Sequence, residues 1–157
     1  MIVGSSSFAP SFIDAIDGGG TGSGNGLGYS LVGDHQLESV PFQNIDTIYL
    51  EFTEDVSVTL SDGDIILTGA IGGTYSLGQI SYNSQTNVAS VPVTGGIDRD
   101  SLVISIFESS VTDISGNGLV NDAGEQFDFF FNVLPGDEDG SGQVNSLDVF
   151  NLSLIHI

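Results

Sequence analysis

The chain has 157 residues, 39% of them hydrophobic, and its single basic side chain stands against 21 acidic ones, for a formal net charge of −20. This length and composition favour one folded domain with a substantial core and a smaller unit beside it. The charge excludes nucleic acid and anionic membrane surfaces as partners, because Arg99 alone cannot neutralise phosphates.

The chain contains no cysteine, which excludes a disulfide framework and thiolate metal sites. No apolar run approaches the roughly 18 residues needed to span a bilayer, so membrane insertion is not expected. The first residues lack the basic and apolar regions of a signal peptide, and we expect any secretion signal to lie upstream.

Residues 1–37 carry two weak apolar patches around a glycine-rich run over residues 18–28. Such a run is typical of flexible coil. The sequence therefore predicts a flexible N-terminal segment at 1–37, with no convincing amphipathic helix before residue 146.

Residues 38–134 consist of short apolar runs that mostly alternate and are separated by turn residues. Alternation of this kind predicts strands that bury one face, such as the face formed by Ile48, Leu50 and Phe52. Regular spacing of the turns indicates an all-β fold, an antiparallel β-sandwich of about seven or eight strands. The clearest expected strands cover residues 46–53, 56–60, 65–67, 80–82, 88–93, 102–107 and 127–133. Pro135 and Gly136 end the last strand and mark a domain boundary.

Residues 137–148 have the spacing of an EF-hand calcium loop. Gly142 stands at position 6, where the loop turns sharply, and residues 146–151 begin a helix. The predicted oxygen ligands at positions 1, 3, 5, 7, 9 and 12 are Asp137, Asp139, Ser141, Gln143 (through its backbone carbonyl), Asn145 and Asp148. Hard oxygen ligands in this number suit Ca²⁺ better than Mg²⁺, which demands tight octahedral geometry and retains its waters.

Residues 136–152 (GDEDGSGQVNSLDVFNL) resemble the first calcium-binding repeat of a type I dockerin, which has Asp at position 12. The resemblance implies that residues 135–151 are the first half of a paired calcium module. A complete dockerin has two such repeats and binds cohesin domains. A cohesin-like partner is therefore expected if the parent protein carries the second repeat.

Two further motifs resemble the bacterial Ig-like domains of surface-layer and large secreted proteins. They are the strand at residues 48–56 (IYLEFTEDV) and the turn at residues 111–119 (VTDISGNGL). The resemblance implies an Ig-like sandwich in an extracellular or cell-surface bacterial protein. Residues 152–157 (LSLIHI) resemble the translation of a transposon end used in sequencing libraries, which implies a non-native tail.

The other polar or aromatic groups of the sequence are weaker candidates for a site. Turn chemistry explains Asp113, Asn117, Asn121, Asp122 and Glu125 better than a second cation site does. We interpret Glu51, Glu54 and Asp55 as a solvated face rather than a glycosidase pair. His35 has no partner serine or cysteine nucleophile in the sequence pattern, and so a catalytic role is not expected. Tyr49, Tyr75 and Tyr82 could stack on glycans from an exposed sheet face, although ordinary cross-strand packing is favoured.

These features predict a non-catalytic extracellular module that binds Ca²⁺ and serves as a spacer, adhesion or assembly part of a larger protein. The alternative is a carbohydrate-binding sandwich from a polysaccharide-degrading enzyme. No catalytic residues are expected.

Overall fold

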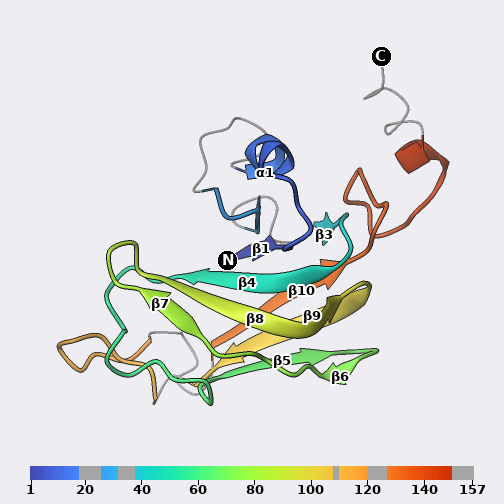
Figure 1. The fold of residues 1–157 in the computed structure, drawn as a ribbon. Coiled ribbons are helices and arrows are strands. Elements are labelled where there is room, and N and C mark those ends of the chain that lie inside the picture. Colours follow the sequence, from blue (N-terminus) through green and yellow to red (C-terminus); the bar gives the residue numbers. More distant parts are fainter. Residues whose placement is uncertain (18–25, 32–37, 108–109, 120–126, 150–157) are drawn as a thin grey trace.

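Two five-stranded sheets face each other in a β-sandwich (Figure 1). The computed structural model describes residues 1–17, 26–31, 38–107, 110–119 and 127–149. The first sheet has the order β2 (Tyr29–Ser30), β1 (Ile2–Gly4), β4 (Ile45–Glu51), β8 (Val88–Ile97), β7 (Ser81–Asn83). The second has the order β3 (Ser39–Val40), β10 (Phe127–Val133), β9 (Asp100–Ile106), β5 (Ile65–Gly69), β6 (Gly73–Thr74). The predicted sandwich is confirmed at this level.

Alternating side chains of the longer strands form the core between the sheets. In β4, Ile48 and Leu50 are buried as predicted, while Phe52 lies just beyond the strand and is half-buried. In β10, Phe131 and Val133 are buried and Phe130, on the opposite face, is exposed. Fully buried core side chains include Val3, Leu31, Val40, Ile45, Ile48, Leu67, Val91, Ile97, Ile104, Val111 and Val133.

One pair of strands departs from the antiparallel arrangement that the sequence predicted. β3 pairs with β10 in parallel, with Ser39 opposite Asn132 and Val40 opposite Val133. The described residues also form ten strands rather than seven or eight. The additional strands, β1, β2, β3 and β6, have only two or three residues each. A run that short cannot show a period-two pattern.

The N-terminal segment is not wholly flexible, contrary to the expectation for residues 1–37. β1 pairs with both β2 and β4, and Val3 and Leu31 are fully buried in the core. Ser6 ties this segment to β4, because its backbone N–H lies 3.0 Å from each carboxylate oxygen of Asp46. The glycine-rich residues 18–25 lie outside the described residues.

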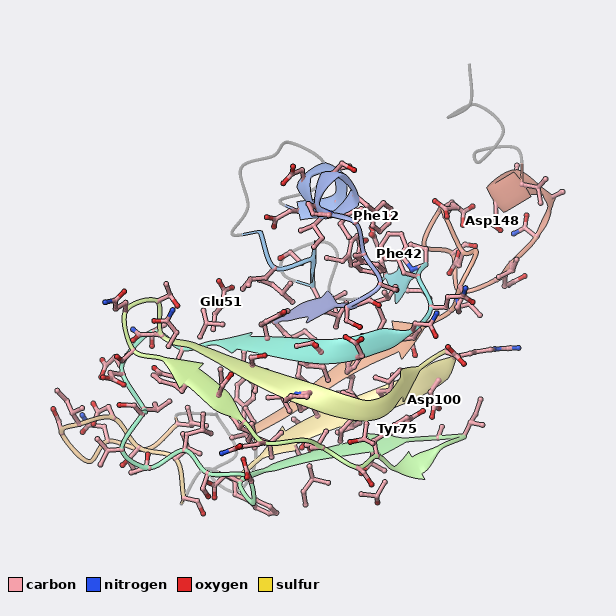
Figure 2. The ribbon with its side chains drawn as sticks, viewed as in Figure 1. Phe12, Phe42, Glu51, Tyr75, Asp100 and Asp148 are labelled. Carbon is pink, nitrogen blue, oxygen red and sulfur yellow. The ribbon has the colours of Figure 1, made fainter. Side chains whose placement is uncertain are left out.

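A short helix, α1 (Pro10–Ile16), also precedes residue 146. Pro10 stands in its first turn, where its missing N–H costs nothing. Phe12 packs edge-on against Phe42, with ring centroids 5.2 Å apart (Figure 2). Seven residues give too few turns for an amphipathic period to show in the sequence.

Residues 56–60 form a turn and not the predicted strand. Leu60 donates its backbone N–H to the carbonyl of Val56 over 3.0 Å. Val56 is 4% exposed, whereas Val58 is 77% exposed. The spacing of Val56 and Leu60 fits one face of a helical turn as well as one face of a strand, and so the apolar pattern was ambiguous.

The segment after β10 stays bonded to the sandwich. Leu134 donates its N–H to the carbonyl of Val40 over 2.9 Å, and Gly136 donates to that of Pro41 over 3.0 Å. In Figure 1 the loop at residues 137–148 follows beside β3. Within the described residues, no helix has the length and apolar character required to cross a membrane.

Candidate metal centre

Three aspartates converge in the loop at residues 137–148. One carboxylate oxygen from each of Asp137, Asp139 and Asp148 lies within 4.8 Å of the others, and this group could hold a metal ion. Asp137 is 1% exposed and Asp148 is fully buried, whereas Asp139 is exposed. Three like charges this close repel one another, and a cation among them would offset that repulsion.

Backbone amides fix the orientation of Asp137. Its Oδ1 accepts a hydrogen bond from the N–H of Ser141 over 3.0 Å, and its Oδ2 accepts one from the N–H of Gly142 over 2.8 Å. Gly142 has a φ of +79°, in the left-handed region that favours glycine. The sharp turn expected at loop position 6 is therefore present, and it aims two N–H groups at the first aspartate.

Asp148 joins the two ends of the loop. Its Oδ1 accepts from the N–H of Glu138 over 2.9 Å, and its Oδ2 accepts from the N–H of Asn145 over 2.7 Å. Asn145 in turn accepts from the N–H of Leu147 through Oδ1 over 2.8 Å. This reciprocal arrangement is a capping box for the helical turn at residues 146–149. Asp148, at loop position 12, thus also caps the first turn of the helix.

The remaining predicted ligands lie in the same loop around the Gln143 carbonyl. The Oγ of Ser141 is 3.3 Å from that carbonyl oxygen, and the Nδ2 of Asn145 is 3.4 Å from it. The Ser141 Oγ is also 3.4 Å from Oδ1 of Asp137. Positions 1, 5, 7 and 9 therefore form a connected chain of polar groups, although Asn145 directs its Oδ1 to the helix cap.

The electrostatics of the loop follow from its bonds and burial. Side-chain and backbone hydrogen bonds from Ser141 lower the pKa of Asp139 below its ordinary value. Burial, followed by the charges of Asp148 and Asp137, raises the pKa of Glu138. Glu138 is not among the predicted site residues, because it stands at loop position 2, which supplies no ligand.

The Asp113 cluster serves a turn in the part of the chain that the structure describes. The backbone N–H groups of Ser115 and Asn117 each donate to Oδ1 of Asp113 over 2.8 Å, and Nδ2 of Asn117 donates to Oδ2 over 2.7 Å. Side-chain and then backbone bonding from Asn117 lowers the pKa of Asp113 to about 2. Asn121, Asp122 and Glu125 lie outside the described residues, as do His35 and the 152–157 tail.

The three acidic residues at the end of β4 do not form a glycosidase pair with one another. Asp55 accepts from the N–H of Ser57 over 2.9 Å, and Glu51 is exposed. Glu54 instead lies beside Asp113 in the lining of an apolar cleft of about 760 Å³, where a hydrogen bond to Asp113 and the charge of Asp113 raise the pKa of Glu54. The sequence showed no sign of this pairing, because it joins distant segments.

The structure does not bring Tyr49, Tyr75 and Tyr82 to one face. Tyr82 stands in register with Ala89 and Leu50, both buried, and so it faces the core; Tyr49 is on the other face of that sheet. Tyr75 donates its hydroxyl to Oδ2 of Asp100 over 2.9 Å. A single stacking platform of three tyrosines is therefore absent.

No protein-family model, curated protein or solved structure matches the chain significantly.

Proposed function

We propose that the chain is a non-catalytic extracellular module whose loop at residues 137–148 binds Ca²⁺. One observation carries the proposal: the carboxylates of Asp137, Asp139 and Asp148 converge within 4.8 Å inside a loop that has EF-hand spacing. Chance acidity would not also place Gly142 at the sharp turn and oxygen donors at positions 5, 7 and 9.

The donor set favours Ca²⁺ over Mg²⁺. Ca²⁺ accepts about six to eight oxygens in flexible geometry, and the loop offers carboxylates, a hydroxyl, an amide and a backbone carbonyl. Mg²⁺ requires a regular octahedron and keeps several waters. The Oδ1 of Asn145 accepts the N–H of Leu147 in the helix cap, and so this position would reach the ion through a water molecule. Ca²⁺ tolerates such an irregular set of ligands better than Mg²⁺ does.

We further propose that the module has an architectural role as a spacer or assembly part of a larger secreted or cell-surface protein. The resemblance to a dockerin repeat and to bacterial Ig-like domains supports this role. Val144 and Leu147, within the loop, and Val149, directly after it, have exposed apolar side chains. A second loop-helix repeat in the parent protein would cover this face and complete a surface for a cohesin-like partner.

Ca²⁺ titration followed by backbone NMR tests the metal assignment. We expect amide signals of residues 137–148 to shift and sharpen, with a Kd of about 10⁻⁴ M or tighter, and Mg²⁺ to bind much more weakly. Signals from β5 and β6, remote from the loop, serve as the internal control. Unchanged loop signals at millimolar Ca²⁺ would disprove the proposal.

A further inference from the structure

Glu38, which directly precedes β3, lies against the loop. The Cγ, Cβ and Cδ atoms of Glu38 are 3.1, 3.2 and 3.4 Å from the point where a Cβ on Gly140 would stand. Gly140 has a φ of +67°, and it stands between Asp139 and Ser141 in the loop. The missing side chain at loop position 4 thus lets a glutamate of the sandwich reach the loop backbone.

Tyr29 of β2 holds Glu38 from the sandwich side. Burial, the charges of Glu38 and Glu138, and a hydrogen bond to Glu38 raise the pKa of Tyr29. The ring of Tyr29 packs edge-on against Phe42, with centroids 5.5 Å apart. The carboxylate is therefore held in place beside the loop by a packed aromatic side chain.

Backbone hydrogen bonds hold the start of the loop beside the segment that follows Glu38. Gly136 donates to the Pro41 carbonyl over 3.0 Å, one residue before the first aspartate of the loop. Val40 accepts from Leu134 over 2.9 Å and is fully buried. Because both segments are tied to the parallel β3–β10 pair, the backbone that carries Glu38 and the start of the loop stay side by side as long as these bonds hold.

We propose that Glu38 is a positioning residue of the cation site, a charge on the sandwich that strengthens Ca²⁺ binding across Gly140 without ligating the ion. The inference rests on the proposed function of the loop. The site then depends on both loop and sandwich, since three aspartates of the loop converge and a fourth carboxylate, that of Glu38, belongs to a side chain packed against Gly140 of the same loop. Ca²⁺ binding should accordingly also stabilise β3 against opening.

The test compares Ca²⁺ affinity of the full chain and of three variants by calorimetry at low ionic strength. Glu38→Gln should weaken binding about threefold to tenfold, because it removes one nearby charge but preserves shape. Glu38→Asp, which keeps the charge, should restore most of the affinity. Glu51→Gln is the matched control, since Glu51 lies at the far end of the sandwich from Asp148 (Figure 2). It should bind like the wild type.

Ionic strength separates an electrostatic role from a merely structural one. The affinity difference between wild type and Glu38→Gln should shrink as salt rises from 10 mM to 300 mM, whereas a packing defect would persist. An unchanged affinity in Glu38→Gln, or a loss that salt leaves unaltered, overturns this inference alone. Absence of Ca²⁺ binding by the wild type overturns it together with the proposed function.

Discussion

Replacing Asp148 by asparagine is expected to weaken Ca²⁺ affinity about 100-fold or more, the largest effect of any single change in the loop. Asp148 is fully buried and accepts hydrogen bonds through both oxygens, from Glu138 and Asn145. An asparagine retains one acceptor but turns an NH₂ group toward one of these N–H donors. The variant therefore loses charge, a ligand atom and half of the helix cap together.

Isothermal calorimetry measures the affinity, and NMR reports whether residues 146–149 remain helical. Asp62→Asn is the matched control, because within the described residues Asp62 accepts one hydrogen bond, from the backbone N–H of Ile80 over 2.8 Å, and asparagine can keep that bond. It should leave the affinity unchanged. Near-wild-type binding by Asp148→Asn would show that position 12 is not a ligand and that the loop only caps a helix.

The loop could be predicted from the sequence because its geometry is local. Each ligand position follows from its distance along the chain to Gly142, and the same spacing brings Asp137 and Asp148 together. The capping box of Asn145 and Asp148 is likewise a short-range pattern. What the spacing could not reveal is the contact of Glu38 with Gly140, which depends on how a distant segment folds.

The strands of the fold likewise divide into those that local sequence patterns predict and those that depend on contacts with distant segments. β4 and β10 each have seven residues, long enough for alternation to predict a strand and its buried face, and the apolar run in β9 predicted a buried strand. β1 and β3 owe their strand conformation to pairing with longer neighbours, and nothing in their own residues indicates it. Tertiary contacts therefore decided the elements that join the N-terminal segment and the loop at residues 137–148 to the sandwich.

Replacing Asp100 by asparagine is expected to destabilise the sandwich by about 2–4 kcal/mol. Asp100 is 3% exposed at the start of β9, and it closes the turn between β5 and β6. Its Oδ1 accepts from the N–H of Ile71 over 2.8 Å, and its Oδ2 accepts from the N–H of Gly72 over 2.8 Å and the hydroxyl of Tyr75 over 2.9 Å (Figure 2). An asparagine must turn its NH₂ toward at least one of these donors, which breaks that hydrogen bond and places two donors against each other at a buried side chain.

Urea unfolding at pH 7 without Ca²⁺ measures this loss, with Asp98→Asn as the control. Asp98 is exposed, and its single described bond, from the N–H of Asn44, is 3.3 Å long. We expect that control to change the free energy of unfolding by less than about 0.5 kcal/mol. Equal effects of the two substitutions would contradict a special role for the buried carboxylate.

The loss of unfolding free energy caused by Asp100→Asn should also depend on pH in a defined direction. Burial of Asp100 opposes its ionisation, but hydrogen bonds from Gly72, Ile71, Tyr75 and Ser101 outweigh it, so that the folded-state pKa lies below the ordinary value. The folded state then binds the proton less readily than the unfolded chain, whose aspartates have a pKa of about 3.9. The stabilisation is complete above that pKa and is lost as the pH falls through the folded-state pKa. The difference between wild type and Asp100→Asn should therefore be constant from pH 5 to pH 7 and shrink below about pH 4, and a difference that grows on acidification would reverse the assigned sign.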